Sequence, residues 1–182
     1  MDLIQQHTSS GYTLEIYRDD YPENPREWDN LGVLYIPRPP RGYSLSDEDA
    51  SLEAYNAAPV KIPIYILDHS GIAISCTPFG DPWDSWHAGF IYMPEDAYTR
   101  YFKDREKAVK CLQREIETLD DYNQGDTYCY LIKNHAGEEL DSCAGYYGKL
   151  GLDCIKEIFR EFLERREIED YPLFHHANIK IA

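Results

Sequence analysis

Residues 64–94 read IYILDHSGIAISCTPFGDPWDSWHAGFIYMP, and this stretch decides the fold. Two apolar runs, 62–67 and 72–75, flank the turn at 68–71, and a third run, 89–93, follows an acidic loop that carries tryptophan. Gly, Pro and Ser interrupt the stretch too often for a helix, so it predicts antiparallel strands.

The turn Asp68-His69-Ser70-Gly71 predicts a hairpin between the first two runs. We expect Gly71 to adopt a positive φ, because glycine does so without steric cost, and Asp68 to bond the turn backbone.

Other elements follow from the period of the apolar residues, which is two in strands and 3.6 in helices. Ser46 is a candidate N-cap, and Pro94 with Glu95 and Asp96 favours a helix start. The expected strands are 12–17, 32–36, 128–133 and 139–143; the expected helices are 47–57, one long helix from Pro94 towards Gly125, and 150–168. The tail, 171–182, is expected either to add an edge strand or to be loose.

These elements predict an α+β fold in a single domain over residues 1–182. The expected architecture is a mainly antiparallel, twisted sheet of about six or seven strands, with the two long helices on one face. The chain has 182 residues, 43% of them hydrophobic, which is enough for a real core and argues against global disorder.

Acidic residues dominate the charge: 33 Asp and Glu stand against 18 Lys and Arg, a formal charge of −15. Such a surface repels nucleic acid and anionic membranes and attracts basic proteins, so direct nucleic-acid binding is not expected. Glu157, Glu161 and Glu164 fall at i, i+4 and i+7 and share one helix face, which can equally be a solvated face. The basic residues of the same helix are expected to pair with some of them; these are Lys156, Arg160, Arg165 and Arg166.

The chain is also rich in aromatic residues, with 16 Tyr and three Trp. Trp28, Trp83 and Trp86 lie in acidic loops that lead into strands. They could anchor an interface with an Arg-rich partner, through stacking and ion pairing, or they could be lids over the sheet.

Five cysteines without a CxxC pair favour reduced thiols in a cytoplasmic protein. The start of the chain does not read as a signal peptide, and no apolar run approaches the roughly 20 residues that cross a bilayer.

Signatures of catalysis are weak. Asp68, His69 and Ser70 are adjacent in one turn, where a hydrolase triad needs side chains that converge in space. Asp81 and Asp84, with Glu95 and Asp96, could bind a cation or act as an acid–base pair, but they also suit a turn and a helix start.

Metal binding has little support either, because the candidate spacings match no zinc pattern. The candidate ligands are His69, Cys76, Asp81 and His87, with His175 and His176 near the end of the chain. We therefore expect no catalytic residue, no metal and no cofactor. A small metal-dependent hydrolase that uses Asp68, His69 and Asp84 is the alternative enzyme reading.

The segments DHSGIAIS, DPWDS and GFIYMP, within residues 64–96, resemble the sequence pattern of a group of small acidic proteins carried by bacteriophages and mobile elements. That group includes type II-A anti-CRISPR proteins, which inhibit the type II effector nuclease. The chain departs from the pattern at Trp86, where the group has Gly after Ser85.

The resemblance implies a phage-type protein that binds and inhibits a host CRISPR effector nuclease stoichiometrically, in the bacterial cytoplasm. Such nucleases hold guide and target in a positively charged channel, which an acidic protein can occupy as a DNA mimic. An antirestriction or other anti-defence interaction protein is the alternative. The residues expected to bind the partner are Trp28, Asp29, Asp81, Trp83, Asp84, Trp86, Glu157, Glu161 and Glu164.

Overall fold

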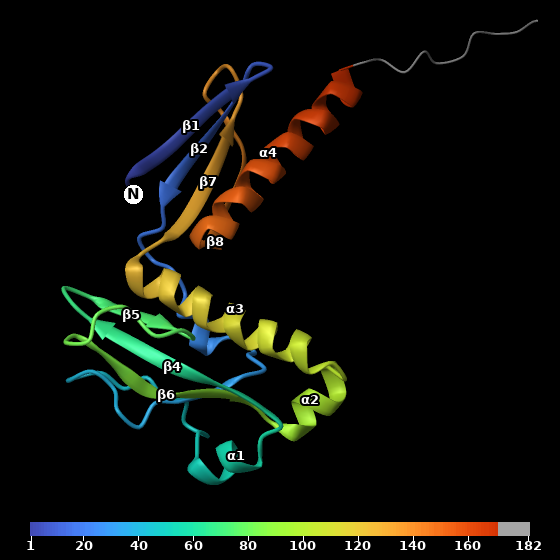
Figure 1. Ribbon diagram of the computed structural model, residues 1–182. Coiled ribbons are helices and arrows are strands. Elements are labelled where there is room, and N and C mark those ends of the chain that lie inside the picture. Colours follow the sequence, from blue (N-terminus) through green and yellow to red (C-terminus); the bar gives the residue numbers. More distant parts are fainter. Residues whose placement is uncertain (171–182) are drawn as a thin grey trace, which may run out of the picture. The chain divides into compact units, whose positions relative to one another are not determined.

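The computed structural model describes residues 1–170, which form an α+β fold with eight antiparallel strands in two four-stranded sheets (Figure 1). The chain divides into two compact units. The central unit is Tyr21–Asp126, and the split unit combines Met1–Asp20 with the described residues from Thr127 onward. The α+β class with antiparallel sheets is confirmed. The single sheet is wrong, because the strands separate into two sheets. The single domain stays a prediction.

The central unit has a sheet in the order β3-β6-β4-β5. Helix α3 runs along one face of this sheet, and the short helix α1 lies on the other side (Figure 1). The bounds of its elements are η1 Pro25–Glu27, β3 Val33–Tyr35, α1 Leu52–Ala57, β4 Val60–Asp68, β5 Ile72–Ser75, β6 Ser85–Met93, α2 Glu95–Tyr101 and α3 Arg105–Gln124.

The core of the central unit lies between the sheet and α3. Ile64 and Ile66 alternate along β4 and point to the same face, where they are fully buried together with Ile91 of β6. Leu112 and Ile116, one turn apart on α3, close this core from above. Each such side chain contributes about 1.5–3 kcal/mol through burial.

The region after Pro94 forms two helices, where one long helix was predicted. The chain is extended at Phe102, with φ −127° and ψ 154°, and it restarts with Asp104, whose carboxylate accepts the N–H of Glu106 at 2.9 Å. A side-chain cap of this kind starts a new helix. Gly125 ends α3 in the left-handed conformation, φ 69°, as predicted.

Helix α1 begins later than predicted. Ser51 is its N-cap and accepts the N–H of Ala54 at 3.1 Å. The expected cap, Ser46, instead accepts the backbone N–H of Ile36 at 2.7 Å and so fastens a loop to the end of β3.

The hairpin between β4 and β5 is confirmed, with Asp68 opposite Ile72. The prediction for its turn is wrong in one respect: Ser70, at φ 62°, adopts the left-handed conformation in place of Gly71. The N–H of His69 donates to the carbonyl of Gly71 at 3.1 Å within this turn.

The split unit has a sheet in the order β1-β2-β7-β8, and α4 packs on one face of it (Figure 1). Its elements are β1 Leu3–Ser9, β2 Tyr12–Arg18, β7 Thr127–Lys133, β8 Glu139–Tyr147 and α4 Gly148–Asp170. Leu14, Ile16 and Ile132 face Ile155 and Phe159 of α4 in its core.

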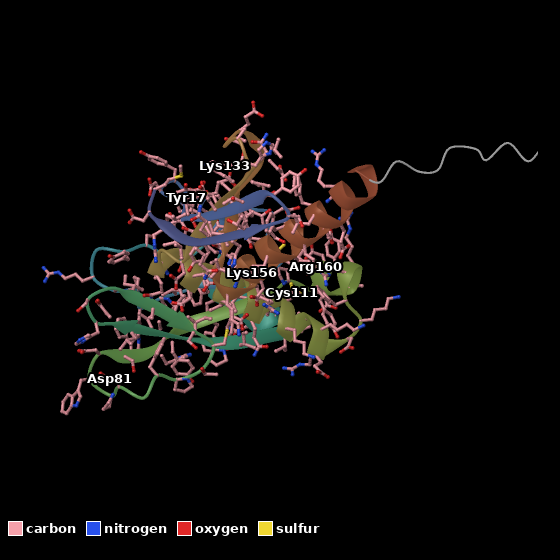
Figure 2. All side chains as sticks on the ribbon, turned by 90° about the horizontal axis from the view of Figure 1, so that it is seen from above. Tyr17, Asp81, Cys111, Lys133, Lys156 and Arg160 are labelled. Atoms are coloured by element: carbon pink, nitrogen blue, oxygen red, sulfur yellow. The ribbon has the colours of Figure 1, made fainter. Side chains whose placement is uncertain are left out.

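The other face of the split unit's sheet is polar. Lys133 pairs with Glu15 at 2.6 Å, and the hydroxyl of Tyr17 donates to the same carboxylate at 2.7 Å (Figure 2). The two long helices therefore cover two different sheets, α3 in one unit and α4 in the other, which corrects the prediction that both pack on one face. Within residues 1–170, every helix is too short or too polar to cross a bilayer.

Candidate functional site

The Trp83 loop, residues 81–85, comprises the end of the β5–β6 connection and the first residue of β6, and side chains of the loop hold its backbone in place. The Oδ1 atom of Asp81 accepts the backbone N–H groups of Trp83 and Asp84 at 2.8 and 3.1 Å. The hydroxyl of Ser85 donates to the carbonyl of Asp81. Hydrogen bonds from the backbone of Asp84 and of Trp83 lower the pKa of Asp81, which favours the ionised carboxylate that accepts them.

Trp83 itself projects into solvent, and 90% of its surface is exposed. Its indole is the most exposed of the three tryptophans, on a backbone that Asp81 fixes. An exposed aromatic ring on a preorganised loop loses little conformational freedom on binding, which is typical of an interface anchor.

The Trp83 loop is tied to the β4–β5 turn. The N–H of Asp68 donates to the carbonyl of Asp84 at 2.9 Å, and Nδ1 of His69 lies 2.8 Å from Oδ2 of Asp84. The hydrogen bond to Asp84, and then its charge, raises the pKa of His69. The two loop motifs of the sequence, DHSG and DPWDS, therefore meet in space.

This His69–Asp84 pair does not resemble a catalytic dyad in its surroundings. The side chains are 69% and 43% exposed, so they lack the desolvation that tunes a general acid or base. Ser70 belongs to the same turn as His69, with its backbone in the left-handed region. The pair is better described as a brace between two loops.

Trp86 has a different role from Trp83. It lies in β6 opposite Ile66, packs against the core, and donates its indole N–H to the carbonyl of Arg38 at 2.9 Å. The sequence left two alternatives for the tryptophans, a lid over the sheet or an exposed interface anchor. Trp86 fits the first and Trp83 the second.

The third motif segment, 89–93, is structural. A Cβ on Gly89 would lie 2.1 Å from the carbonyl oxygen of Tyr35, so only glycine fits where β3 leaves the sheet. The register shifts between Ile64 and Tyr65, which leaves one extra residue on β6. This bulge brings the rings of His87 and Phe90 together, with centroids 4.7 Å apart, on the face away from α3.

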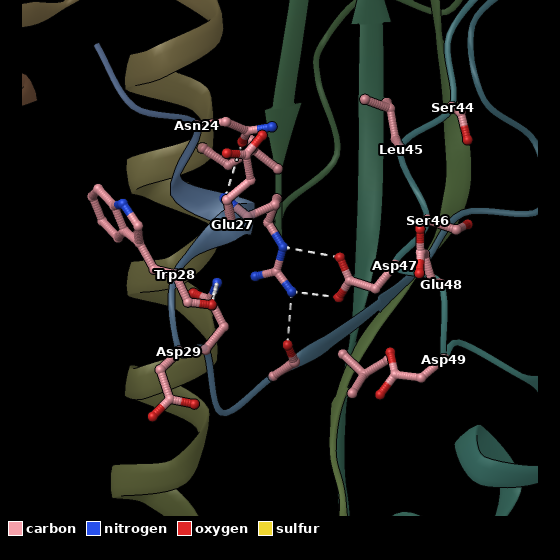
Figure 3. A pocket seen from close by; sticks show the side chains of 15 residues that line it. Asn24, Glu27, Trp28, Asp29, Ser44, Leu45, Ser46, Asp47, Glu48 and Asp49 are labelled. Carbon is pink, nitrogen blue, oxygen red and sulfur yellow. Dashed lines mark hydrogen bonds and ion pairs between the residues drawn. The ribbon is translucent and has the colours of Figure 1, made fainter.

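An acidic pocket of about 550 Å³ lies elsewhere in the central unit (Figure 3). Trp28, 41% exposed, stands on its wall and donates its indole N–H to Glu23 at 3.2 Å. Four carboxylates that are exposed to solvent line the pocket: Glu27, Asp29, Glu48 and Asp49.

Arg26 forms the floor of this pocket and was not anticipated from sequence. Its guanidinium bonds Asp47 through Nε at 3.2 Å and the carbonyl of Gly32 through Nη2 at 2.7 Å (Figure 3). It also bonds Glu115 through Nη1 at 3.0 Å. Burial raises the pKa of Glu115, and the hydrogen bond from Arg26 opposes that rise. The cluster fastens the pocket to α3. The sequence did not indicate this cluster, because a single Arg between Pro25 and Glu27 forms no recognisable motif.

Glu157, Glu161 and Glu164 are exposed on α4, in the split unit. They do not form a purely acidic face. Arg160 pairs with Glu157, and Arg165 lies 3.8 Å from Glu161. The charge on this face of α4 is therefore mixed.

The candidate metal ligands His69, Cys76, Asp81 and His87 are not brought together. Within residues 1–170, no three His, Cys, Asp or Glu side chains converge in a way that could hold a metal ion. His175 and His176 lie outside the described residues.

The chain matches no protein-family model, and it has no match among curated proteins or solved structures. Its relationship to phage-borne acidic proteins stays a prediction from the motifs.

Proposed function

We propose that this chain is a phage-type inhibitor that binds a type II CRISPR effector nuclease stoichiometrically in the cytoplasm of the bacterial host. The observation that carries the proposal is Trp83: an indole 90% exposed, on a loop held closed by carboxylate hydrogen bonds. In this proposal the protein acts by occupying its partner's surface and performs no chemistry of its own.

The charge around the anchor supports a cationic partner. Asp81 and Asp84 flank the indole. The carboxylate of Asp81 accepts N–H groups of the loop, that of Asp84 pairs with His69, and neither pairs with a Lys or Arg among residues 1–170. An arginine of the partner can stack on the ring of Trp83 and reach either carboxylate. An exposed tryptophan beside carboxylates thus fits a lysine- and arginine-lined nucleic-acid channel.

The acidic pocket supplies a second contact of the same chemistry. Asp29 and Glu27 stand beside Trp28 on one wall, and Glu48 and Asp49 line another part of it. A lysine or arginine side chain of the partner would enter this pocket and find carboxylates on several sides. These carboxylates would take the place of the DNA phosphates that the same side chain contacts in the nuclease channel. This is the DNA-mimicking part of the proposal.

The direct test is target-DNA cleavage by the type II effector with its guide, at increasing amounts of the full chain. We expect cleavage to stop near one inhibitor per nuclease, and we expect slower association as salt rises, because salt screens the steering charges. Trp83→Ala should weaken binding by 30-fold or more, about 2 kcal/mol, which is typical of a buried aromatic anchor.

Tyr43→Ala is the matched control, since Tyr43 is another exposed aromatic residue of the same unit, at 55%. Undiminished cleavage at large molar excess, with no complex on a sizing column, would rule the proposal out for that effector. Inhibition of a restriction enzyme in the same assay would instead support the antirestriction alternative.

A further inference from the structure

Among the described residues, strand β1 forms an open edge on the sheet of the split unit. In the order β1-β2-β7-β8, β1 pairs with β2 alone among the described strands. Its sequence, LIQQHTS, contains no Asp, Glu, Lys, Arg or Pro, which are the residues that usually prevent an edge from pairing with another chain. Six of its seven residues are exposed to solvent.

The opposite edge, β8, is protected. It carries Glu139 and Asp141, and its register against β7 shifts twice, between Tyr128 and Tyr130 and again between Ile132 and Lys133. Charge and irregular pairing both disfavour the addition of a strand there. Of the two edges of this sheet, β1 is therefore the one at which another strand could pair.

The backbone of β1 offers its free groups in a regular row. A two-residue turn, Ser10-Gly11, with φ of 49° and 79°, joins β1 to β2, and Ser9 faces Tyr12 across it. The pair that flanks such a turn is hydrogen-bonded, and the bonded pairs alternate along the ladder. Gln6 and Thr8 therefore direct their N–H and C=O groups to the open edge.

A groove of about 350 Å³ runs between this edge and α4. Leu14, Phe159 and Leu163 supply its apolar part, and its polar side chains are all neutral or basic. His7 and Ser9 come from β1, and Lys156 and Arg160 from successive turns of α4 (Figure 2). The lining holds no carboxylate, which is unusual in a chain of charge −15.

We propose that the split unit binds an extended peptide segment of a partner protein as a fifth strand on β1. Main-chain hydrogen bonds to Gln6 and Thr8 supply the pairing, and alternate side chains supply the specificity. One large apolar side chain enters the groove, and acidic side chains two residues before and after it meet Lys156 and Arg160, where the second acid competes with Glu157 for Arg160. The recognised segment is therefore extended, with the pattern acid-x-apolar-x-acid.

The charges favour this occupant over a second copy of the chain. A second β1 strand would bring no carboxylate to Lys156, which has no ion pair with any described residue. Two copies would also bring together two molecules of charge −15. The peptide surface is separate from the Trp83 loop, so the inference does not depend on the proposed function.

The test uses fluorescein-labelled heptapeptides and the full chain, with fluorescence anisotropy as the readout. The probe Thr-Glu-Thr-Phe-Thr-Glu-Thr places both acids and the ring on one face of a strand. We expect it to bind at least 10-fold more tightly than the same peptide with Lys in place of Glu. Hydrogen exchange should slow at the amides of Gln6 and Thr8 when the acidic peptide is added.

Two matched pairs of variants locate the site. Gln6→Pro removes an outward donor and should abolish binding, while Gln6→Ala should retain it. Lys156→Glu should weaken binding of the acidic peptide at least 10-fold, while Lys149→Glu, on the same helix but outside the groove, should leave it unchanged. Circular dichroism checks that each variant is folded.

Three outcomes would overturn the inference. They are no binding of the acidic peptide at 1 mM, binding that Gln6→Pro and Lys156→Glu leave intact, and a concentration-dependent dimer that Gln6→Pro abolishes. The last would assign the edge to a second copy.

Discussion

Replacing Arg26 by methionine should destabilise the central unit more than any exposed charge replacement. The Arg26 side chain is only 11% exposed, and its partners Asp47 and Glu115 are 20% and 12% exposed. Methionine keeps most of the apolar stem but removes the guanidinium, so two carboxylates remain largely buried without their cation. Breaking one side of a buried ion pair costs about 3–5 kcal/mol.

The chain provides a convenient assay and a control. All three tryptophans lie in the central unit, so the change of tryptophan fluorescence in urea reports the unfolding of that unit. With a slope of about 2 kcal/mol per molar urea, the midpoint should fall by roughly 1.5–2.5 M. Lys110→Met breaks the exposed pair with Glu106, where the side chains are 68% and 76% exposed, and should cost about 0.5 kcal/mol or less.

The pH dependence gives a second criterion. Burial already raises the pKa of Glu115, and loss of Arg26 should raise it further. A carboxyl whose pKa is higher in the folded state destabilises the fold increasingly as pH rises, so Arg26→Met should lose more at pH 7 than at pH 5. Adding Glu115→Gln should restore at least 1 kcal/mol at pH 7. An Arg26→Met variant as stable as Lys110→Met would refute the reasoning.

Three further predictions concern single positions in the central unit. Burial, and then the neighbouring carboxylates, raise the pKa of Asp121 to about 6. Asp121→Asn removes this unfavourable charge and should stabilise the chain at pH 7 by about 1 kcal/mol, a value reduced for solvent screening of the partly exposed side chain. Urea unfolding should show this gain at pH 7 and no effect at pH 3.5. In an NMR titration, His69 should lose its proton at a higher pH than it does in Asp84→Asn; equal values would exclude the brace. Gly89→Ala should cost at least about 2 kcal/mol in thermal or urea unfolding, because the new Cβ meets the backbone of Tyr35; an unchanged midpoint would contradict the close approach.

Much of the secondary structure could be predicted because its signals are local. The β4–β5 hairpin, the β7–β8 hairpin and the end of α3 at Gly125 all rest on turn residues and on the period of apolar residues. Strand β1 was missed because it has only two large apolar residues, at its first two positions, and no alternation.

The division into two sheets could not be predicted in the same way. The alternation of apolar and polar residues along a strand indicates which of its faces is buried, but not which other strand pairs with it. The pairing of β2 with β7, through partners such as Leu14 and Ile132, joins segments more than 100 residues apart in the sequence.

The candidate site was predicted in part. Trp83, Asp81 and Asp84 were singled out together, and they do form one hydrogen-bonded loop. The brace from His69 depends on two turns that meet only in the folded chain, and the Arg26 cluster joins residues 89 positions apart.

The central unit is inserted between the two segments of the split unit, and this order has a consequence for synthesis on the ribosome. The first hairpin, β1 with β2, emerges early, but its third strand, β7, is made only after the whole of Tyr21–Asp126. At about 5–20 residues per second, the nascent hairpin waits at least several seconds, while the inserted segment already has every strand of its own sheet. The inserted segment should therefore complete its sheet first, while the nascent hairpin still lacks its third strand.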